Sequence, residues 1–446
     1  MKEMGPVIDH YRSDWLRFQR ESTGSMPEWI KRYRQAAGTC FADMGFPTSH
    51  HEERRYTDVT PVMETPFAFA WHAPEISKGE AEPIVSWVGP RHQLTFVNGH
   101  FAPSLSLLHR LPQGVIVGSL RDCDEASSSL LEPHLGRHAW HEDHAFVALN
   151  AAFLNDGAFL YLPAKMAVEE PILVLFLSSP EGQATISHPR VLVVAGPSSQ
   201  ATVIEGYVGM KGDCYFTNAV TEVVLGEEAV VNHHLLQEES QAAYHIATLA
   251  VHQERNSTFM SHSLALGGAL ARIEVHGLLA DEGSTCTLRG LYAAAGRQHV
   301  DIHTRIEHAR RRCTSRQLYN GILGGHARGV FDGRVLVRQD AHKTDASQTN
   351  KNLLLSEDAV VHSTPQLEIF ADDVKCVHGT TVGQLDPDAL FYLRSRGLDL
   401  EDARRVMTQA FSSELFGYIG PARIRDRFTE LLSQWTLRTS SESLSA

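Results

Sequence analysis

The chain has 446 residues, of which 43% are hydrophobic, and its formal net charge at pH 7 is −13. That hydrophobic fraction is typical of a globular protein, and no segment approaches the roughly 20 consecutive apolar residues that a membrane-spanning helix needs. The negative charge argues against a nucleic-acid partner, because binding to the phosphate backbone requires a basic surface. The first residues contain no apolar stretch of the kind found in secretory signals, which predicts a cytoplasmic protein.

The cysteines are scattered along the chain, and none of them belongs to a C-x-x-C pair. They are Cys40, Cys123, Cys214, Cys286, Cys313 and Cys376. Without a secretory signal, this distribution predicts reduced thiols rather than a disulfide framework.

The N-terminal region, residues 1–83, is predicted to be helical and irregular. Trp29, Ile30, Tyr33 and Ala37 recur at the spacing of one helix face. The next region is predicted to be a mixed α/β entry into the core, spanning residues 84–170. Its three strand signals and one helix signal lie at 84–87, 93–97, 115–120 and about 142–154.

Residues 171–385 form a succession of short apolar runs, each bounded by Gly, Asp, Ser or Pro. Runs such as ILVLFL, RVLVVA and ATVIEGYV predict consecutive strands without the intervening helices of βαβ units. Regular short strands joined by tight turns fit a parallel β-helix, in which each turn stacks on the last. The pattern alone is equally compatible with a large β-sandwich, because the turns show no visible sequence repeat.

Helices are predicted again at residues 386–438. Asp386 precedes Pro387 and can accept an orphan backbone N–H as the N-cap of a helix, and Asp399 can cap a second helix. The polar tail, residues 439–446, is predicted to be disordered.

The strongest candidate site lies just before these helices. After a turn at Asp372 and Asp373, strand periodicity places Cys376 and His378 on one face, and Gly379 predicts a bend that leaves this face open to a neighbour. A thiolate and an imidazole both suit iron and iron–sulfur clusters, but two ligands cannot hold a stable four-ligand cluster, so such a site would be shared or transient. In the alternative interpretation, Cys376 is a small buried hydrophobe and His378 is a hydrogen-bonded histidine at a strand end.

Other histidines are weaker candidates for a metal site. His138, His141 and His144 come closest to a ligand array, but their spacing of three spreads them around a helix and favours a solvated or capping role. His233 and His234 would point to opposite faces of a strand, which argues against a paired role as ligands.

Motifs of self-sufficient enzymes are absent from the sequence. There is no G-x-x-x-x-G-K-[ST] phosphate loop, no strand–GxGxxG–helix unit and no G-x-S-x-G elbow. The sequence therefore predicts a protein that is not an enzyme by itself.

The stretch PQLEIFADDVKCVHGTTVGQLDPDALFYLRSRG (365–397) resembles the signature of SufD, a scaffold subunit of iron–sulfur cluster assembly in the SufB/SufD family. Segments 331–359, 96–106 and 148–172 resemble the same family. The related subunit SufB carries a Cys-Asp-Ser motif where this chain reads NLLL (352–355), which favours SufD over a SufB-like paralogue.

The resemblance implies a mainly β fold, with a right-handed parallel β-helix core and helical regions at both ends. It implies a non-catalytic scaffold that pairs with SufB through the β-helix, binds the ATPase SufC through its C-terminal helices, and could pair with a second copy when alone. The functional histidine of the family falls on His378, with Cys376 beside it, as part of a transient iron or Fe–S cluster site rather than a stably bound cofactor. Exposed arginines are expected to supply a polar rim for SufC: Arg394, Arg396, Arg404 and Arg405.

Two alternatives belong to other functional classes. A carbohydrate-active β-helix enzyme would need clustered acidic residues or a Ca²⁺ site and is usually secreted, whereas this chain offers only Asp372 and Asp373 and no secretory signal. A self-associating structural protein is compatible with the exposed strand edges of a solenoid.

Overall fold

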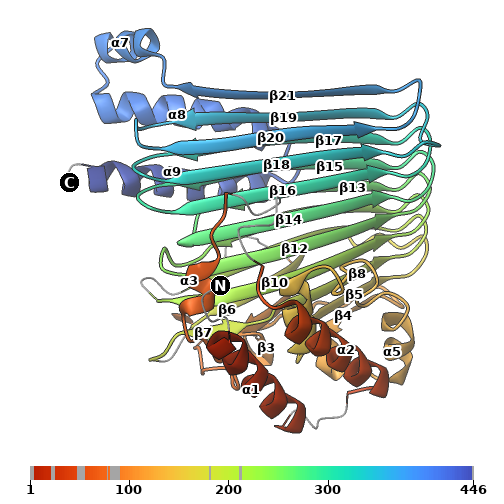
Figure 1. The fold of residues 1–446 in the computed structure, drawn as a ribbon. Helices are drawn as coiled ribbons and strands as arrows, with labels where there is room; N and C mark the ends of the chain where they lie inside the picture. The colour runs from red at the N-terminus through yellow and green to blue at the C-terminus, as the bar shows by residue number, and fades with distance from the viewer. Residues whose placement is uncertain are drawn as a thin grey trace.

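The computed structural model describes residues 5–21, 26–47, 56–77, 79–80, 91–179, 182–209 and 213–443. The strand expected at 84–87 lies outside the described residues. Figure 1 shows a long stack of strands with helices beside both of its ends.

The described strands form two sheets, here named sheet A and sheet B, of 11 and 10 strands. The strands of sheet A are β1 (Ala68–Phe69), β4 (Ile116–Ser119), β5 (Ala158–Leu162), β7 (Thr185–Ser187), β8 (Arg190–Ala195), β10 (Tyr215–Leu225), β12 (Tyr244–Gln253), β14 (Leu270–Leu279), β16 (His299–His308), β18 (Arg328–Val337) and β20 (Val360–Ile369). The strands of sheet B are β2 (His92–Val97), β3 (His100–Phe101), β6 (Ile172–Ser178), β9 (Gln200–Gly209), β11 (Val230–Glu238), β13 (Thr258–Ala265), β15 (Thr285–Ala294), β17 (Thr314–Leu323), β19 (Asp345–Leu354) and β21 (Lys375–Gln384).

From β8 onward, successive strands alternate between the two sheets, and every strand pairs in parallel with the strand one turn away. This winding is a parallel β-solenoid, and it confirms the predicted β-helix over the sandwich. Each strand contributes one face to the interior, where apolar residues stack in rows along the solenoid. One such row runs through Val193, Val223 and Val251, all buried and in register. Burying each of these valines stabilises the fold by roughly 1.5–3 kcal/mol.

The turns that lead from sheet A to sheet B repeat one backbone geometry with different residues. Ser198, Glu228, Asn256 and Arg312 all adopt left-handed backbone conformations, with φ between 54° and 60°. Each backbone N–H in this set donates to a carbonyl oxygen of the following turn, for example Glu228 to Arg255 at 2.8 Å. Because the residue types differ while the geometry recurs, the repeat is present in the backbone but invisible in the sequence.

The helices divide into two groups. The N-terminal group comprises α1 (Gly5–Glu21), α2 (Glu28–Met44), α3 (Thr60–Glu64), α5 (Glu125–Leu131) and α6 (Ala145–Ala152), with short 3₁₀ turns at Pro103–Leu105 and Leu120–Asp122. Its aromatic residues, among them Tyr11, Phe18 and Phe146, pack with Phe216 of β10 in one cluster. These helices cover the first turns of the solenoid (Figure 1).

The C-terminal group comprises α7 (Pro387–Ser395), α8 (Leu400–Gly417) and α9 (Ala422–Ser443). Asp386 and Asp399 cap α7 and α8 through their side chains, as predicted. Phe428 and Trp435 of α9 pack against Leu236 and Leu264, so α9 lies along the outer wall of sheet B. Of the polar tail expected to be disordered, residues 439–446, the part as far as Ser443 belongs to α9, and the last three residues lie outside the described residues.

Candidate functional site

The two final strands, β20 and β21, form an open end of the solenoid. Strand β20 pairs only with β18 and β21 only with β19, so each is the edge of its sheet within the described chain. The residues of both strands are exposed or half-buried, unlike the buried strands before them. In Figure 1, β21 is the last strand of the stack.

Backbone groups at this end point outward in an alternating pattern. The N–H of Lys375 donates to the carbonyl oxygen of Thr344, the residue just before β19, at 2.8 Å. Since successive residues of a strand turn their N–H and C=O groups to opposite sides, the backbone groups of Cys376, His378 and Thr380 face the open edge. By the same argument Pro365 faces the open edge of β20, where its missing N–H costs no ladder hydrogen bond.

Cys376 and His378 lie on the same face of β21, as the strand periodicity predicted. They stand in register with Ala346 and Gln348 of β19. His378 is exposed, whereas Cys376 is half-buried beside Val335 and other apolar residues. Burial raises the pKa of the Cys376 thiol above its ordinary value, so the isolated chain holds it as a thiol rather than a thiolate.

The bend expected at Gly379 is not present. Strand β21 continues through Gly379 to Gln384, paired with β19 along its whole length. The His378 face is open because no further strand follows β21 in its sheet within the described residues, not because the chain turns away. Glycine would permit a bend here, but the backbone pairing with β19 keeps the strand extended.

A row of polar side chains leads through the interior to His378. Leu288, Gln317, Gln348 and His378 occupy successive turns in register, so the row changes from apolar to amide to imidazole toward the open end. Gly333 leaves room for this row, because a Cβ there would lie 2.0 Å from Nε2 of Gln348. Sequence inspection missed these glutamines, since only the register brings residues about 30 apart into one row.

Two polar atoms of this row are buried without a hydrogen-bond partner among the described residues. They are Nε2 of Gln317 and Oε1 of Gln348. Unsatisfied buried polar atoms are costly, at about 1–3 kcal/mol each, so this row stabilises the fold less than an apolar row would. Beside them, Thr380 donates to Ser363 at 2.9 Å across the end of the solenoid.

The four arginines expected to form a rim lie on or beside α7 and α8. Arg394 and Arg396 are exposed, and the Arg396 guanidinium stands over the Tyr392 ring. Arg404 pairs with a glutamate one helical turn away at 3.1 Å, and Arg405 pairs with an aspartate at 2.5 Å. Both pairs are at the surface and are worth little for stability.

Large apolar side chains on α7 were not singled out from the sequence. Phe391 is 74% exposed and Tyr392 is 56% exposed, and α7 has no buried residue at all. On the neighbouring helix, Val406 is also exposed. Such a group of exposed aromatic and aliphatic residues is typical of a protein-binding surface.

Two adjacent histidines point to opposite faces of β11, as their strand spacing predicted. His233 faces the interior and contacts Oε1 of Glu205 at 3.0 Å, while His234 faces outward and stacks on His262. The two rings therefore lie on opposite faces of β11 and form no joint ligand pair.

Comparison with known proteins identifies the family. A family model described as "SUF system FeS cluster assembly, SufBD core domain" matches residues 176–411, and a second, "SufBD protein N-terminal region", matches residues 7–174. The chain belongs to the SufBD family. The core match begins within β6 and ends within α8, so it contains the whole open end.

Relatives agree with this assignment over most of their length. An iron–sulfur cluster assembly SufBD family protein of Synechocystis sp. is 32% identical over 430 residues, which cover 95% of this chain and 94% of that protein. The iron–sulfur cluster assembly protein SufD of Escherichia coli is 30% identical over 403 residues, covering 89% and 90%. The Bacillus subtilis protein SufD is 28% identical over 335 residues, covering 71% of each chain.

Within the SufBD fold of this chain, the open end combines three chemical features. It offers unpaired strand edges, a half-buried thiol and an exposed imidazole. Such an end can add a strand from another protein while contributing sulfur and nitrogen ligands to a shared site. Among the described helices, none is both long and apolar enough to cross a bilayer.

Proposed function

We propose that this chain is a SufD-type, non-catalytic scaffold subunit that pairs with SufB, binds the ATPase SufC and contributes to iron acquisition and nascent Fe–S cluster assembly in the cytoplasm. The observation that carries this proposal is the unpaired edge of β21, which ends the solenoid directly beside Cys376 and His378. A scaffold that assembles its cargo between two subunits needs both an edge for the partner and ligands at that edge.

The pairing with SufB is proposed to use the edge of β21. Strand β20 carries Pro365 at its open edge, and proline blunts an edge against strand addition. Strand β21 contains no proline, and its outer face exposes Val377 at 64%. The same edge would accept a second copy of this chain when SufB is absent, so the proposal includes a homodimer of the isolated chain.

The cargo is proposed to be iron or a nascent cluster held only in the complex. Cys376 and His378 supply two ligands, and a cluster needs four, so SufB must complete the set. Because burial raises the pKa of Cys376, the thiol releases its proton only when a cation takes its place. The isolated chain therefore carries no stable cluster in this proposal.

The docking of SufC is proposed to use α7 and α8. Phe391 and Tyr392 would be buried by the ATPase as apolar anchors, which are the residue types that dominate binding energy at interfaces. The four arginines, Arg394, Arg396, Arg404 and Arg405, would form the polar rim around these anchors.

The pairing is tested with two substitutions at one position of the β21 edge. Thr380→Pro removes an edge-facing N–H and should weaken the binding of SufB at least about tenfold, because proline cannot donate to the new ladder. Thr380→Val is the matched control, since it also loses the hydroxyl bond to Ser363 but keeps the N–H, and its affinity should stay near that of the wild type. Equal SufB affinity in both folded variants, measured by titration calorimetry, would place the interface elsewhere.

A further inference from the structure

A second cluster of ligating side chains lies far along the chain from the open end, on the outer face of sheet A. One ring nitrogen each from His144 and His276 and a carboxylate oxygen of Glu274 all lie within 4.8 Å of one another. We propose that these three residues form a binding site for a divalent transition-metal ion. This proposal does not depend on the scaffold function proposed above, because it concerns other residues on another wall of the solenoid.

The three side chains come from two rigid elements. Glu274 and His276 are two residues apart on β14, so both point to the outer face of sheet A. His144 stands at the N-cap of α6, and its own side chain makes no capping hydrogen bond to the helix. From the sequence, His144 was expected to be solvated or to cap a helix. In the structure it lies beside two further candidate ligands.

The helix that carries His144 is fixed onto the sheet by buried polar contacts. The side-chain amide of Asn150 in α6 donates to the carbonyl oxygens of Pro189 and Asn218, both at 2.8 Å. The segment before α6 is fixed as well, since three backbone N–H groups, at residues 136, 138 and 139, donate to the buried Glu222 carboxylate. His144 is therefore held in place before any ligand arrives, which lowers the cost of binding.

The two oxygens of Glu274 have different environments. Oε1 accepts a 2.5 Å hydrogen bond from Nε of Arg272, while Oε2 lies 3.1 Å from Nε2 of His144 and 3.8 Å from Nε2 of His276. Metal–ligand bonds of about 2.0–2.2 Å place neighbouring ligand atoms roughly 3.3–3.6 Å apart, so both separations are within a small adjustment of this value. Arg272 thus acts on Glu274 as an outer partner that fixes the orientation of the ligand.

Charges of both signs surround the cluster. Arg272 is held between two carboxylates, those of Glu274 and Asp301, and Arg305 stands in register with His276 on the next strand. Burial alone would raise the pKa of Asp301, but Arg272 and His303 outweigh it and hold the pKa well below its ordinary value. With Arg272 held by these two carboxylates, Oε2 of Glu274 is left facing the two imidazoles.

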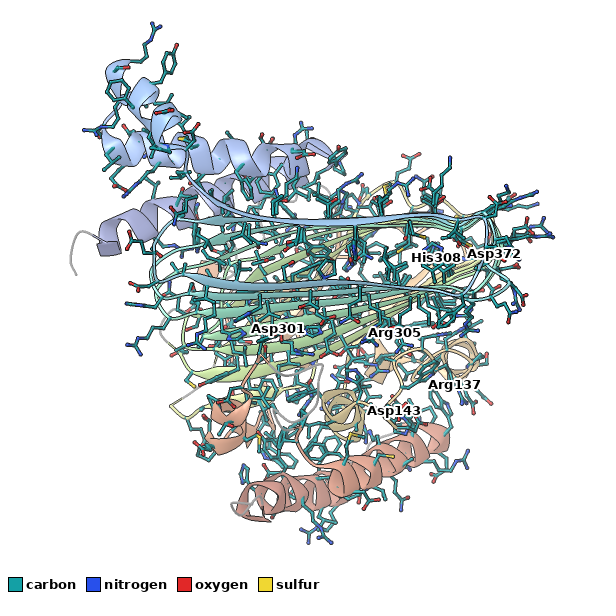
Figure 2. All side chains as sticks on the ribbon, turned by 45° about the horizontal axis from the view of Figure 1, so that its top comes forward. Arg137, Asp143, Asp301, Arg305, His308 and Asp372 are labelled. Carbon is teal, nitrogen blue, oxygen red and sulfur yellow. The ribbon has the colours of Figure 1, made fainter. Side chains whose placement is uncertain are left out.

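His276 supplies a further indication of a missing ligand. Its Nε2 is buried and makes no hydrogen bond within the described chain, although the ring as a whole is partly exposed. The cluster lies in the wall of a cavity of about 310 Å³ between the 138–147 segment and strands β12, β14, β16 and β18. Figure 2 shows Asp143 on one side of this region and Asp301 and Arg305 on the other.

Two imidazoles and one carboxylate define the class of metal. This ligand set is the one that proteins use for catalytic zinc and for non-haem ferrous iron, with the remaining coordination positions open to solvent or substrate. Here those positions face the cavity, so the site is exchangeable rather than structural. It does not suit Cu(I), which prefers thiolate and thioether ligands.

Cobalt(II) titration of the full-length, metal-free protein tests the proposal under anaerobic conditions. We expect one equivalent of Co²⁺ to bind with visible d–d absorption bands, and Zn²⁺ to displace it. His276→Ala and His144→Ala should each weaken binding at least about tenfold, because even outer partners of a metal ligand change affinity by about 10–100-fold. His276 is the safer change for folding, since its side chain is 37% exposed.

Two histidine variants serve as controls for the titration. His252→Ala removes a histidine that lines the same cavity but bonds to Glu254 at 2.9 Å, and it should leave the affinity unchanged. His378→Ala removes the imidazole of the open end, so a failure of that site is distinguished from a failure of this one. Absence of saturable Co²⁺ binding, affinity retained in both the His276 and His144 variants while folding is intact, or inability of Zn²⁺ to displace Co²⁺ would each overturn the proposal.

Discussion

The two ends of the solenoid are finished in opposite ways. At the first end, the sheets close with short antiparallel pairs, β2 with β3 and β4 with β5, and the helices α1, α2 and α6 cover the neighbouring turns with aromatic side chains. At the last end, β20 and β21 remain exposed, and the interior row changes from leucine to glutamine and histidine. The first end is closed and packed, whereas the last end leaves free the strand edges that the proposed pairing would use.

The largest expected difference in stability between the two ends concerns a buried ion pair and an exposed one. Glu222 near the first end is buried with Arg190 at 2.5 Å, whereas Asp358 near the last end forms an exposed pair with His326. Glu222→Gln should lower the free energy of unfolding by roughly 3–5 kcal/mol, because it leaves the Arg190 charge buried without its partner. Asp358→Asn should change it by less than about 0.5 kcal/mol. Denaturant titration of both variants at pH 7 measures the contrast.

The same pair predicts a pH dependence. Burial alone would raise the pKa of Glu222, but Arg190 and three backbone N–H donors outweigh it and hold the pKa below its ordinary value. Its contribution is therefore fully present above the unfolded-state pKa of about 4.3 and is lost as the pH falls through the lower folded-state pKa. Stability of the wild type should fall more steeply on acidification than that of Glu222→Gln. Parallel curves for the two proteins would show that Glu222 is not linked to folding in this way.

Matched valine truncations give the next largest effect. Val193 is 1% exposed in the interior of β8, and Val377 is 64% exposed on β21. Val193→Ala should cost roughly 2–3 kcal/mol through lost burial and the cavity it leaves. Val377→Ala should cost less than about 0.5 kcal/mol in the isolated chain. A large loss of stability at Val377 would contradict an end that is open in the free protein.

Substitutions of the two candidate ligands should also differ in their effect on the free energy of unfolding, with the larger cost at the more buried residue. The difference should be smaller than for the two valines. Cys376→Ser places a hydroxyl among apolar residues and should cost about 0.5–2 kcal/mol, whereas His378→Ala, at an exposed position, should cost less than about 0.5 kcal/mol. In cells that rely on this system, His378→Ala should nevertheless abolish cluster assembly. The readout is the activity of a cluster-dependent enzyme divided by the amount of intact complex. Wild-type activity per complex in this variant would show that His378 is not a ligand needed for cluster assembly.

The smallest stability effect is expected on α7. Phe391→Ala should leave the free energy of unfolding unchanged, since this side chain is exposed, yet weaken SufC binding by about 2 kcal/mol, or roughly thirtyfold. Charge reversal at Arg404 and Arg405 should weaken it less, as expected of rim residues. Surface immobilisation of SufC allows the three variants to be compared directly. Unchanged affinity in all of them would exclude α7 and α8 as the docking surface.

Sequence patterns predicted the local structure well where one residue type determines it. The caps at Asp386 and Asp399, the strand face shared by Cys376 and His378, and the strand succession from 171 all followed from short-range chemistry. The parallel winding did not, because its repeat consists of left-handed backbone turns at Ser198, Glu228 and equivalent positions occupied by different residues. The family resemblance, rather than the pattern, distinguished the β-helix from a sandwich.

The sequence could not predict the full composition of the two candidate sites, because this depends on the register between distant strands. The polar row from Gln317 to His378 and the cluster of His144 with Glu274 join residues that are 61 or more positions apart, which no spacing rule connects. The bend expected at Gly379 failed for a related reason, since pairing with β19 outweighs the freedom of glycine. Whether an end of the solenoid is covered likewise depends on where distant helices pack.

Hydrogen exchange at the amides of β21 tests the open end most directly. In the isolated chain, the N–H groups of Cys376, His378 and Thr380 face the edge and should exchange fast, while that of Lys375, bonded to Thr344, should be protected. Addition of SufB should protect Cys376, His378 and Thr380 together. Continued fast exchange of these three amides in the assembled complex would contradict the claim that the edge of β21 is the pairing surface.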